Sequence, residues 1–239
     1  MKMPDLTLPD AVDFHTGESA QAVAQALAQA VAGKLRERLD EALEASLVVS
    51  GGSTPLLFFQ ALSALELDWH RVRVLLADER WVDEWDAASN TRLVKDTLLQ
   101  GPAAAARFLS LKQAGAAPEE GMAEVRRELA QLPLPVDVLV LGMGADGHTA
   151  SLFPDAPELA AAMDPAGKEL AAAMTPASQA HRRITLTLAV LGRARHTFLH
   201  LKGGDKLDTL RRALEQPQDV LAMPIRAFLK PGLQVFWSP

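Results

Sequence analysis

The chain has 239 residues, 49% of them hydrophobic, and a formal net charge of −6 at pH 7. A chain of this length forms one large domain or two small ones, and because no linker or repeat interrupts it, we expect a single domain over residues 1–239. The acidic balance argues against nucleic acid as a partner. The absence of cysteine excludes disulfides, thiol nucleophiles and cysteine-based zinc sites.

The sequence also indicates a cytoplasmic protein that does not bind membranes. A chain without cysteine fits the cytosol. Residues Met1–Asp13 contain no apolar segment of the kind that a secretory signal requires. No apolar run reaches the roughly 18 residues that a membrane-spanning helix needs.

Helices and short strands are expected to alternate in the first half of the chain. The spacing of Ala and Leu from Glu18 to Ala45 predicts one long amphipathic helix or two shorter ones. Ser89-Asn90 is typical of a cap for a helix through Leu99, and the dipole of a helix over 118–131 would favour Glu119 and Glu120 in its first turn. A further helix is expected over 56–67. Strands are expected at 47–49, 72–77, 108–111 and 136–141.

The second half continues this alternation. Residues 160–173 are rich in alanine but contain Pro165 and Gly167, so they are expected to form a helix or a loop. Gly203-Gly204-Asp205-Lys206 is expected to open a helix through Glu215. Strands are expected at 184–188, 197–201 and 233–237. Alternating strands and helices predict an α/β fold, an open, mainly parallel twisted sheet with helices on both faces, doubly wound.

A glycine-rich turn follows the predicted strand at 136–141. Three glycines lie within six residues, and Asp146 and His148 stand among them. Glycine lets the backbone take positive φ and lets a ligand approach closely, and histidine exchanges protons readily near neutral pH. This pattern favours a catalytic edge. The alternative is a plain turn with a surface histidine.

The same glycines, Gly142, Gly144 and Gly147, also match the G-x-G-x-x-G pattern of dinucleotide-binding sites. That motif requires a full helix after the glycines, so that the pyrophosphate can bind at the helix N-terminus. Here Pro154 follows too soon for more than about one helical turn. The sequence therefore argues against a dinucleotide cofactor.

A second glycine-rich turn predicts an anion site. Thr54 is a natural N-cap and Pro55 a natural first residue for the helix that follows, and such a helix N-terminus suits a phosphate. No lysine stands where a Walker A loop would need one. The alternative is an ordinary capped turn. The predicted phosphate-binding residues of this turn are Ser50, Gly51, Gly52, Ser53 and Thr54.

Charged residues near other predicted strands extend this site. Asp78-Glu79-Arg80 follows the strand at 72–77, and ligands bind at the carboxyl edge of open α/β sheets. Asp205 is expected to cap a helix with Lys206 in its first turn, where a bound phosphate would offset the unfavourable dipole. Arg183 shares one face of a strand with two threonines and suits an oxyanion. The alternative for each is a solvated charge.

Histidines at other positions are expected to be structural. His196 and His200 share one face of a predicted strand, but no carboxylate accompanies them, so we interpret both as packing or surface residues. No third ligand is apparent, and no metal site or cofactor is expected.

Taken in order, several sequence blocks resemble the 6-phosphogluconolactonases, which lie within the larger family of sugar-phosphate isomerases that includes glucosamine-6-phosphate deaminase. The resemblance covers nearly the whole chain, and D-G-H-T-A-S-L-F-P is its most specific block. G-G-S-T-P and G-x-x-K are shared with the deaminases. Gly192-Arg193 departs from the family, where an asparagine-containing turn is expected. The blocks are V-S-G-G-S-T-P (49–55), A-D-E-R-W-V (77–82), S-N (89–90), G-M-G-A-D-G-H-T-A-S-L-F-P (142–154), R-I-T-L-T (183–187) and G-G-D-K (203–206).

This resemblance implies hydrolysis of 6-phosphoglucono-δ-lactone to 6-phosphogluconate in the oxidative pentose phosphate pathway, on a fold like that of the isomerases and deaminases. His148 would be the general base, Asp146 would orient it or the substrate, and Arg80 would stabilise the oxyanion or grip the substrate. The partner would be this small substrate, and the chain a monomer or a weak homo-oligomer. The residues expected to bind the substrate and its phosphate are Ser50, Gly51, Gly52, Ser53, Thr54, Asp78, Arg183 and Lys206.

Two other functions remain open. An aldose–ketose isomerase or deaminase could use the same fold. A sugar-phosphate sensor without catalytic activity would keep the phosphate site and need not keep His148.

Overall fold

The computed structural model describes residues 6–239, and its main feature is a seven-stranded sheet in which every neighbouring pair is parallel. Residues 1–5 lie outside the described residues. They form part of the segment Met1–Asp13, in which the sequence predicted no secretory signal. The strands, in their order across the sheet, are β1 (Asp13–Thr16), β10 (Leu233–Ser238), β9 (His196–Lys202), β6 (Val138–Leu141), β2 (Ala45–Val49), β3 (Val72–Leu76) and β5 (Arg107–Leu109).

The central strands are apolar because they are covered on both faces. Every residue of β2 and β6 is buried, and both strands are rich in Val and Leu. Continuous apolar runs of this kind are typical of the middle of a parallel sheet, where helices cover both sides. The predicted α/β fold with an open, mainly parallel sheet is confirmed.

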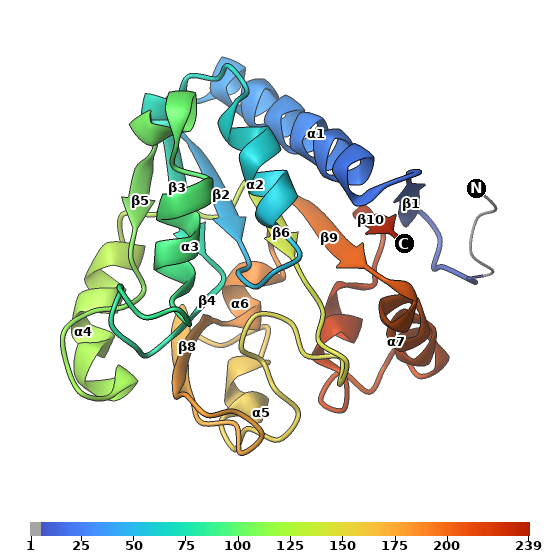
Figure 1. The fold of residues 1–239 in the computed structure, drawn as a ribbon. Coiled ribbons are helices and arrows are strands. Elements are labelled where there is room, and N and C mark those ends of the chain that lie inside the picture. Colours follow the sequence, from blue (N-terminus) through green and yellow to red (C-terminus); the bar gives the residue numbers. More distant parts are fainter. Residues whose placement is uncertain (1–5) are drawn as a thin grey trace.

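Helix α1 (Ala20–Glu41) packs beside α2 (Leu56–Ser63) across one face of the sheet (Figure 1). The Ser19 side chain accepts a hydrogen bond from the backbone N–H of Ala22 and so caps α1. The buried stripe of α1 includes Leu27 and Leu35, and burying each such side chain contributes about 1.5–3 kcal/mol. The segment that the sequence left as one or two helices is one.

The remaining helices lie between later strands. The predicted starts of α3 after Ser89 and of α4 at Pro118 are confirmed, and Glu119 and Glu120 occupy the first turn of α4. Among residues 6–239 no helix is long and apolar enough to cross a membrane. The further helices are α3 (Asn90–Thr97), α4 (Pro118–Leu129), α5 (Leu159–Ala162), α6 (Leu188–Leu191) and α7 (Gly204–Glu215), with short 3-10 turns η1 (Trp69–Arg71), η2 (Gly101–Ala105) and η3 (Pro224–Phe228).

A small antiparallel sheet that the sequence did not predict lies near the carboxyl edge of the main sheet (Figure 1). It consists of β4 (Asp78–Arg80), β8 (Arg183–Leu186) and β7 (Ala171–Met174). Helix or loop was expected through Ala173, but only the short α5 forms and β7 follows it. Alanine is a strong helix former, and pairing with β8 overrides that preference here. The short elements β1 and α6 were also missed.

Two predicted helix caps are wrong by one or two residues. Thr54 was expected to cap α2, but Pro55 occupies the N-cap position and no side chain caps the helix. Asp205 was expected to cap α7, but the helix begins at Gly204 and Gly203 occupies the cap position with φ 94°, a conformation that favours glycine. Lys206 still lies in the first turn of α7, as predicted.

The order of the strands places a crevice at the end of two central strands. From β2 the chain moves outward through β3 to β5, and it then returns to β6 on the other side of β2. Ligands bind beside the carboxyl ends of strands at such a reversal. In Figure 1 the arrowheads of β2, β6 and β9 all point toward this edge.

The opposite, amino end of the sheet holds a buried charge. Asp137 is only 2% exposed, and its Oδ2 accepts hydrogen bonds from the backbone N–H and the hydroxyl of Ser46 at 2.9 and 3.0 Å. Its Oδ1 pairs with Arg38 Nε at 3.0 Å and Arg195 Nε at 3.3 Å. We refer to these four residues as the Asp137 network.

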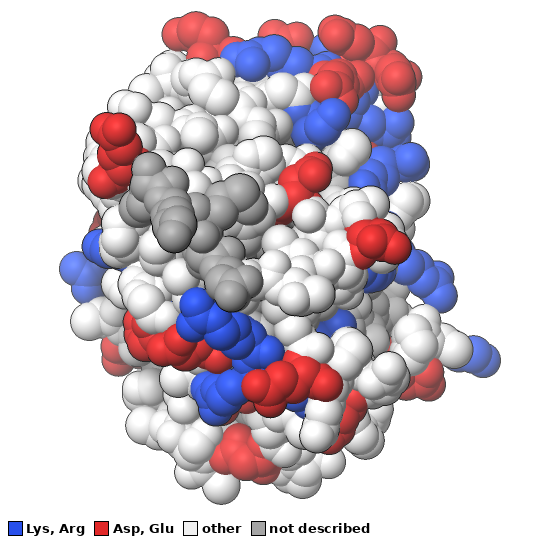
Figure 2. Space-filling model, turned by 90° about the vertical axis from the view of Figure 1, so that its right-hand side faces the viewer, with Lys and Arg blue, Asp and Glu red and all other residues white. Residues whose placement is uncertain are grey.

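On the face of the molecule shown in Figure 2, basic and acidic side chains are interspersed, and neither sign of charge covers the surface.

Candidate active site

A cavity of about 260 Å³ opens at the carboxyl edge of the sheet. All the residues that the sequence singled out for catalysis or substrate binding line this cavity, except Asp146. They are Ser50, Gly51, Gly52, Ser53, Thr54, Asp78, Arg80, His148, Arg183 and Lys206. The predicted turns therefore share one edge, as expected from the carboxyl ends of parallel strands.

A tight turn at residues 142–148 brings His148 to the cavity. The Gly144 N–H donates to the His148 carbonyl at 2.8 Å, and the Gly147 N–H donates to the Gly144 carbonyl at 3.1 Å. A Cβ atom on Gly144 would lie 2.1 Å from the His148 ring, so only glycine lets the imidazole fold back over the turn. No helix begins directly after Gly147, since the next one is the short α5, and the dinucleotide motif therefore lacks the element it requires.

His148 and Asp146 form a hydrogen-bonded pair within this turn. His148 Nδ1 lies 2.6 Å from Asp146 Oδ1, which also accepts the His148 backbone N–H at 3.1 Å. Burial acts to raise the pKa of Asp146, but the hydrogen bonds and charge of His148 outweigh it and hold that pKa below its usual value. An ionised Asp146 fixes the proton of the imidazole on Nδ1 and leaves Nε2 as the basic nitrogen.

Phe153 packs against one face of the His148 ring. Its ring is 1% exposed and stacks on the His148 ring, with the centroids 3.9 Å apart. The guanidinium carbon of Arg183 lies 5.0 Å from the same phenyl centroid. One buried aromatic ring thus limits the positions of both functional side chains.

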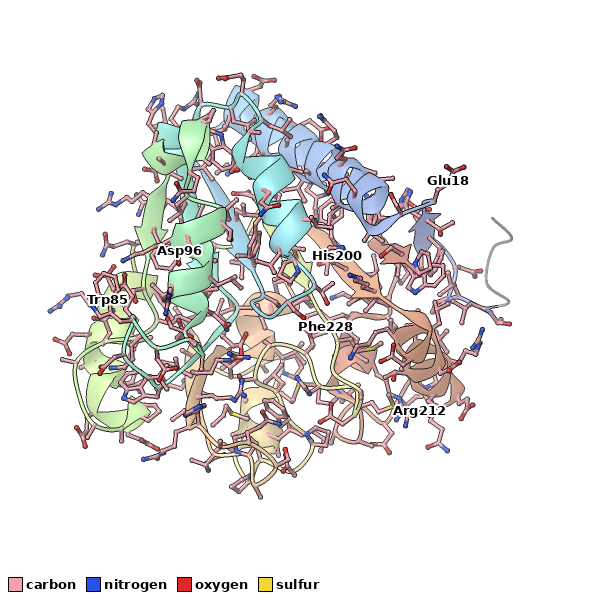
Figure 3. All side chains as sticks on the ribbon, in the orientation of Figure 1. Glu18, Trp85, Asp96, His200, Arg212 and Phe228 are labelled. Atoms are coloured by element: carbon pink, nitrogen blue, oxygen red, sulfur yellow. The ribbon has the colours of Figure 1, made fainter. Side chains whose placement is uncertain are left out.

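Segments from the end of the chain hold the turn in place. Arg212 of α7 donates to the Ala145 carbonyl at 2.7 Å, and the Ile225 N–H donates to the Gly147 carbonyl at 2.9 Å. Met223 packs so closely that a Cβ atom on Gly147 would lie 2.6 Å from its Cε. Figure 3 shows Arg212 reaching from α7 toward this turn.

The predicted charge cluster at 78–80 is not solvated. Glu79 is fully buried and accepts the backbone N–H groups of Arg80, Asn90 and Thr91 at 2.7, 2.8 and 2.6 Å. Burial raises the pKa of Glu79, although those hydrogen bonds partly offset the effect. The Glu79 carboxylate thus joins β4 to the N-terminus of α3 and fixes the backbone from which Arg80 reaches the cavity.

Asn90 lines the cavity, although it was not among the predicted site residues. Its side-chain amide donates to the Asp78 carbonyl at 3.1 Å. A Cβ atom on Gly51 would lie 2.0 Å from Asn90 Oδ1, so a glycine is needed there for the amide to reach the turn. The sequence signals for Asn90 were its place beside the cap Ser89 and the S-N block (89–90) of the family resemblance, but neither assigned it to the site.

Arg183 and Asp78 face one another in the small sheet. Arg183 Nη1 lies 3.9 Å from Asp78 Oδ2, and the Ser151 hydroxyl donates to the same carboxylate oxygen at 2.5 Å. Arg183 Nη2 donates to Gln179 at 2.7 Å, but Nε is buried without a partner. Burial lowers the pKa of Arg183, Asp78 opposes that shift, and Arg80 adds to it. The strand β8 is buried on both faces rather than on one.

The glycine-rich turn at 50–55 forms the other end of the cavity. The Ser50 N–H donates to the Val140 carbonyl at 3.0 Å, which fixes the turn to β6. The Ser50 hydroxyl is buried without a hydrogen-bond partner. Lys206 faces this end from the first turn of α7, and no carboxylate among residues 6–239 pairs with it.

His200 is a second cavity residue that sequence reasoning did not assign to the site. It is 6% exposed, lines the cavity, and packs edge-on against Phe58 with the ring centroids 6.1 Å apart. Burial lowers the pKa of His200 to about 4. The alternation of side chains along β9 predicted which face of the strand His200 is on, but not that the side chain is buried.

Within the described residues, no group of three or more His, Asp or Glu side chains could hold a metal ion.

Comparison with known proteins gives consistent matches over the full length. Residues 18–237 match the model of the family described as glucosamine-6-phosphate isomerases/6-phosphogluconolactonase. A 6-phosphogluconolactonase of Pseudomonas aeruginosa is 49% identical over 239 residues, covering 100% of both chains, and one of Pseudomonas putida is 42% identical, covering 100% of this chain and 98% of its own. The crystal structure of a 6-phosphogluconolactonase from Shewanella baltica superposes with a TM-score of 0.93 at 44% identity, covering 98% of this chain and 100% of the other.

Proposed function

The chain belongs to the family of glucosamine-6-phosphate isomerases and 6-phosphogluconolactonases, and from this premise we propose that it hydrolyses 6-phosphogluconolactone to 6-phosphogluconate in the pentose phosphate pathway. The observation that carries the proposal is the His148–Asp146 pair, with Nδ1 and Oδ1 2.6 Å apart, at a cavity rich in groups that can bind an anion.

The phosphate of the substrate binds at the end of the cavity formed by the turn at 50–55, with Lys206 and Arg183 as cations. The first turn of α2 presents free backbone N–H groups and the positive end of the helix dipole, which favour an anion. The buried, unpartnered hydroxyl of Ser50 and Nε of Arg183 are donors that a bound phosphate would satisfy. Fixing the phosphate positions the lactone carbonyl for reaction.

His148 acts as the general base. Its Nε2 removes a proton from a water molecule, and the oxygen of that water attacks the lactone carbonyl carbon to give a tetrahedral oxyanion. As the oxyanion collapses, the bond to the ring oxygen breaks and the His148 imidazolium returns the proton to that oxygen. One water is consumed, the ring opens, and the carboxylic acid product then loses its proton to solvent.

Asp146 and Arg80 support this reaction. Asp146 keeps the Nδ1–H of His148 directed away from the water and stabilises the imidazolium. Arg80 donates to the Ala88 carbonyl at 2.7 Å, while its Nε is buried without a partner and can serve the oxyanion or the substrate. A lactone is an activated acyl group, so neither a covalent nucleophile nor a metal ion is required in this scheme.

The positions after His148 argue against an isomerase or deaminase. Those reactions open a sugar ring and move a proton between C1 and C2, which calls for a carboxylate near the histidine. Residues 149–154 contain no ionisable side chain. The next carboxylate, Asp155, accepts the backbone N–H of Ser178 at 2.6 Å and is engaged there.

A direct assay tests the proposal. The purified protein is incubated separately with 6-phosphoglucono-δ-lactone, fructose 6-phosphate and glucosamine 6-phosphate, and acid, aldose and ammonia are measured. We expect lactone hydrolysis above the spontaneous rate and no turnover of the other two. Turnover of either sugar phosphate without lactone hydrolysis would reverse the assignment, and no turnover with retained binding would indicate a sensor.

A further inference from the structure

His200 is a buried polar side chain with no protein partner. Its Nδ1 is buried and unpartnered, and among residues 6–239 no group forms a hydrogen bond with either ring nitrogen. The residue is 6% exposed, yet the ring forms part of the cavity wall. Buried polar groups are nearly always hydrogen-bonded, so an imidazole without a protein partner in a cavity wall points to a group from outside the protein, a ligand or a water, that supplies the hydrogen bond.

The surroundings of His200 indicate which part of a ligand it meets. Its ring packs against the edge of Phe58 in the first turn of α2. Figure 3 shows His200 near the N-terminal end of that helix. Its strand, β9, leads directly into Gly203 and Lys206. The Ser50 hydroxyl on the same cavity wall is also buried without a partner. These contacts place His200 beside the first turn of α2 and on the strand that leads into Lys206, the two elements proposed to bind the phosphate.

The chemistry of the ring fits an anion. Because burial lowers its pKa to about 4, His200 is a neutral imidazole at pH 7. A neutral imidazole carries one N–H, and phosphate oxygens are acceptors only. Such a donor adds a hydrogen bond to a phosphate without adding another charge beside Lys206 and Arg183.

We propose that His200 donates a hydrogen bond to the phosphate group of the substrate and thereby helps this site to select phosphorylated over unphosphorylated lactones. The identity of the substrate in this inference rests on the proposed function. The existence of the anion site does not. The competing interpretation is that His200 is a packing residue and contacts no ligand.

The variant His200→Leu separates the two interpretations. Replacing an unpartnered buried polar group by an apolar one removes a desolvation penalty, so the ligand-free variant should melt about 2–4 °C higher than the parent protein. If His200 binds the phosphate, KM for 6-phosphoglucono-δ-lactone rises about tenfold or more, as expected for a lost hydrogen bond to a charged group. The kcat/KM for unphosphorylated glucono-δ-lactone stays the same.

His196 provides a matched control. It lies on the same face of the same strand, but at the end that pairs with Val138, far from the cavity. The variant His196→Leu should leave both KM values unchanged. The variant His200→Gln keeps an N–H donor and should recover part of the affinity for the phosphorylated substrate.

A binding measurement works even if the chain does not hydrolyse the lactone. Inorganic phosphate and 6-phosphogluconate are titrated into the 15N-labelled parent protein, with the His200 signals assigned from His200→Gln. We expect the imidazole resonances of His200 to shift on saturation and those of His196 to stay in place. The phosphate-induced rise in melting temperature should shrink in His200→Leu.

Three results would overturn the inference. In the first, His200→Leu is more stable and both substrates react as before, so that the ring only packs. In the second, kcat/KM falls by the same factor for both lactones, which would show that His200 contacts the sugar or the reacting carbonyl. In the third, the His200 resonances do not move at saturating phosphate, which decides the question even where the leucine variant fails to fold.

Discussion

The two ends of the central sheet treat buried polar groups in opposite ways. At the amino end both oxygens of the buried Asp137 carboxylate have partners within the protein: Oδ2 accepts two hydrogen bonds from Ser46, and Oδ1 forms ion pairs with Arg38 and Arg195 but no hydrogen bond. At the carboxyl end Ser50 Oγ, Arg80 Nε and Arg183 Nε have none, and neither has His200 Nδ1. The main sheet therefore has polar groups that stabilise the fold at one end. At the other end, Ser50 directly after β2, His200 on β9, and Arg80 and Arg183 on the small sheet leave polar groups available to a ligand.

This contrast makes opposite predictions for substitutions at the two ends. Changes at the carboxyl end should reduce activity with little loss of stability. Changes at the amino end should reduce stability with no change in kcat or KM. The variants below test that division, from the largest expected effect to the smallest.

The largest effect is expected at His148. The variant His148→Asn should lower kcat by about 10²-fold or more, because a general base contributes roughly 10²–10⁴-fold to the rate. The imidazole is partly exposed, so the melting temperature should change little. Steady-state hydrolysis of the phosphorylated lactone measures this, with His196→Asn as the control at the amino end. A kcat close to that of the parent protein would remove His148 from the role of base.

At the amino end, Asp137→Ala should destabilise the fold by about 2–3 kcal/mol, because Ser46 loses two buried hydrogen bonds and two arginines lose their partner. Both arginines are partly exposed and can turn to water, which limits the loss. Denaturant unfolding gives the free energy, and the lactone assay at low temperature gives kcat and KM. If this variant lost activity while still folded, the two ends would not be independent.

Lys206→Ala and Arg183→Ala should each raise KM for the phosphorylated lactone by about tenfold or more, as expected when a charged partner of a phosphate is lost. Hydrolysis of unphosphorylated glucono-δ-lactone should be much less affected. Lys202→Ala, on the exposed end of β9, and Arg182→Ala, on the exposed neighbour of Arg183, are matched controls. Equal losses on both substrates would show that neither residue reads the phosphate.

The smallest effect is expected from removing metals. Dialysis against a chelator should leave kcat and KM unchanged, because the proposed reaction needs only a positioned histidine and hydrogen-bond donors. The measurement compares dialysed protein with protein to which zinc or magnesium is returned. Lost activity that a metal restores would contradict a metal-independent mechanism.

Local sequence signals predicted the elements that carry most of the site. The apolar runs of β2 and β6, the cap Ser89 and the glycines of the turn at 142–148 act within a few residues of where they stand, and all fall where they were expected. Ser89 and the glycines of the turn at 142–148 also belong to the blocks that carry the resemblance to the family. The placement of the predicted residues around one cavity followed from the rule that parallel strands end at the same edge.

The features that were missed depend on partners far away in the sequence. Ala171–Met174 has the composition of a helix and becomes a strand only because β8 lies beside it. Whether His200 faces water, a core or a cavity depends on α2 and on the turn at 50–55, which stand about 150 residues earlier, and no local pattern carries that information. Asn90 enters the site because Gly51 has no side chain.

The hydrogen bonds from Arg212 and Ile225 to the turn at residues 145–147 have a consequence for biosynthesis. A ribosome delivers the chain from its N-terminus, and domains begin to fold as they emerge. The phosphate end of the cavity, with Ser50 and Arg183, is delivered before the segment that holds the carbonyls of Ala145 and Gly147. The anion-binding groups Ser50 and Arg183 are therefore synthesised first. The turn that carries His148 is fixed later, when Arg212 and Ile225 have left the exit tunnel.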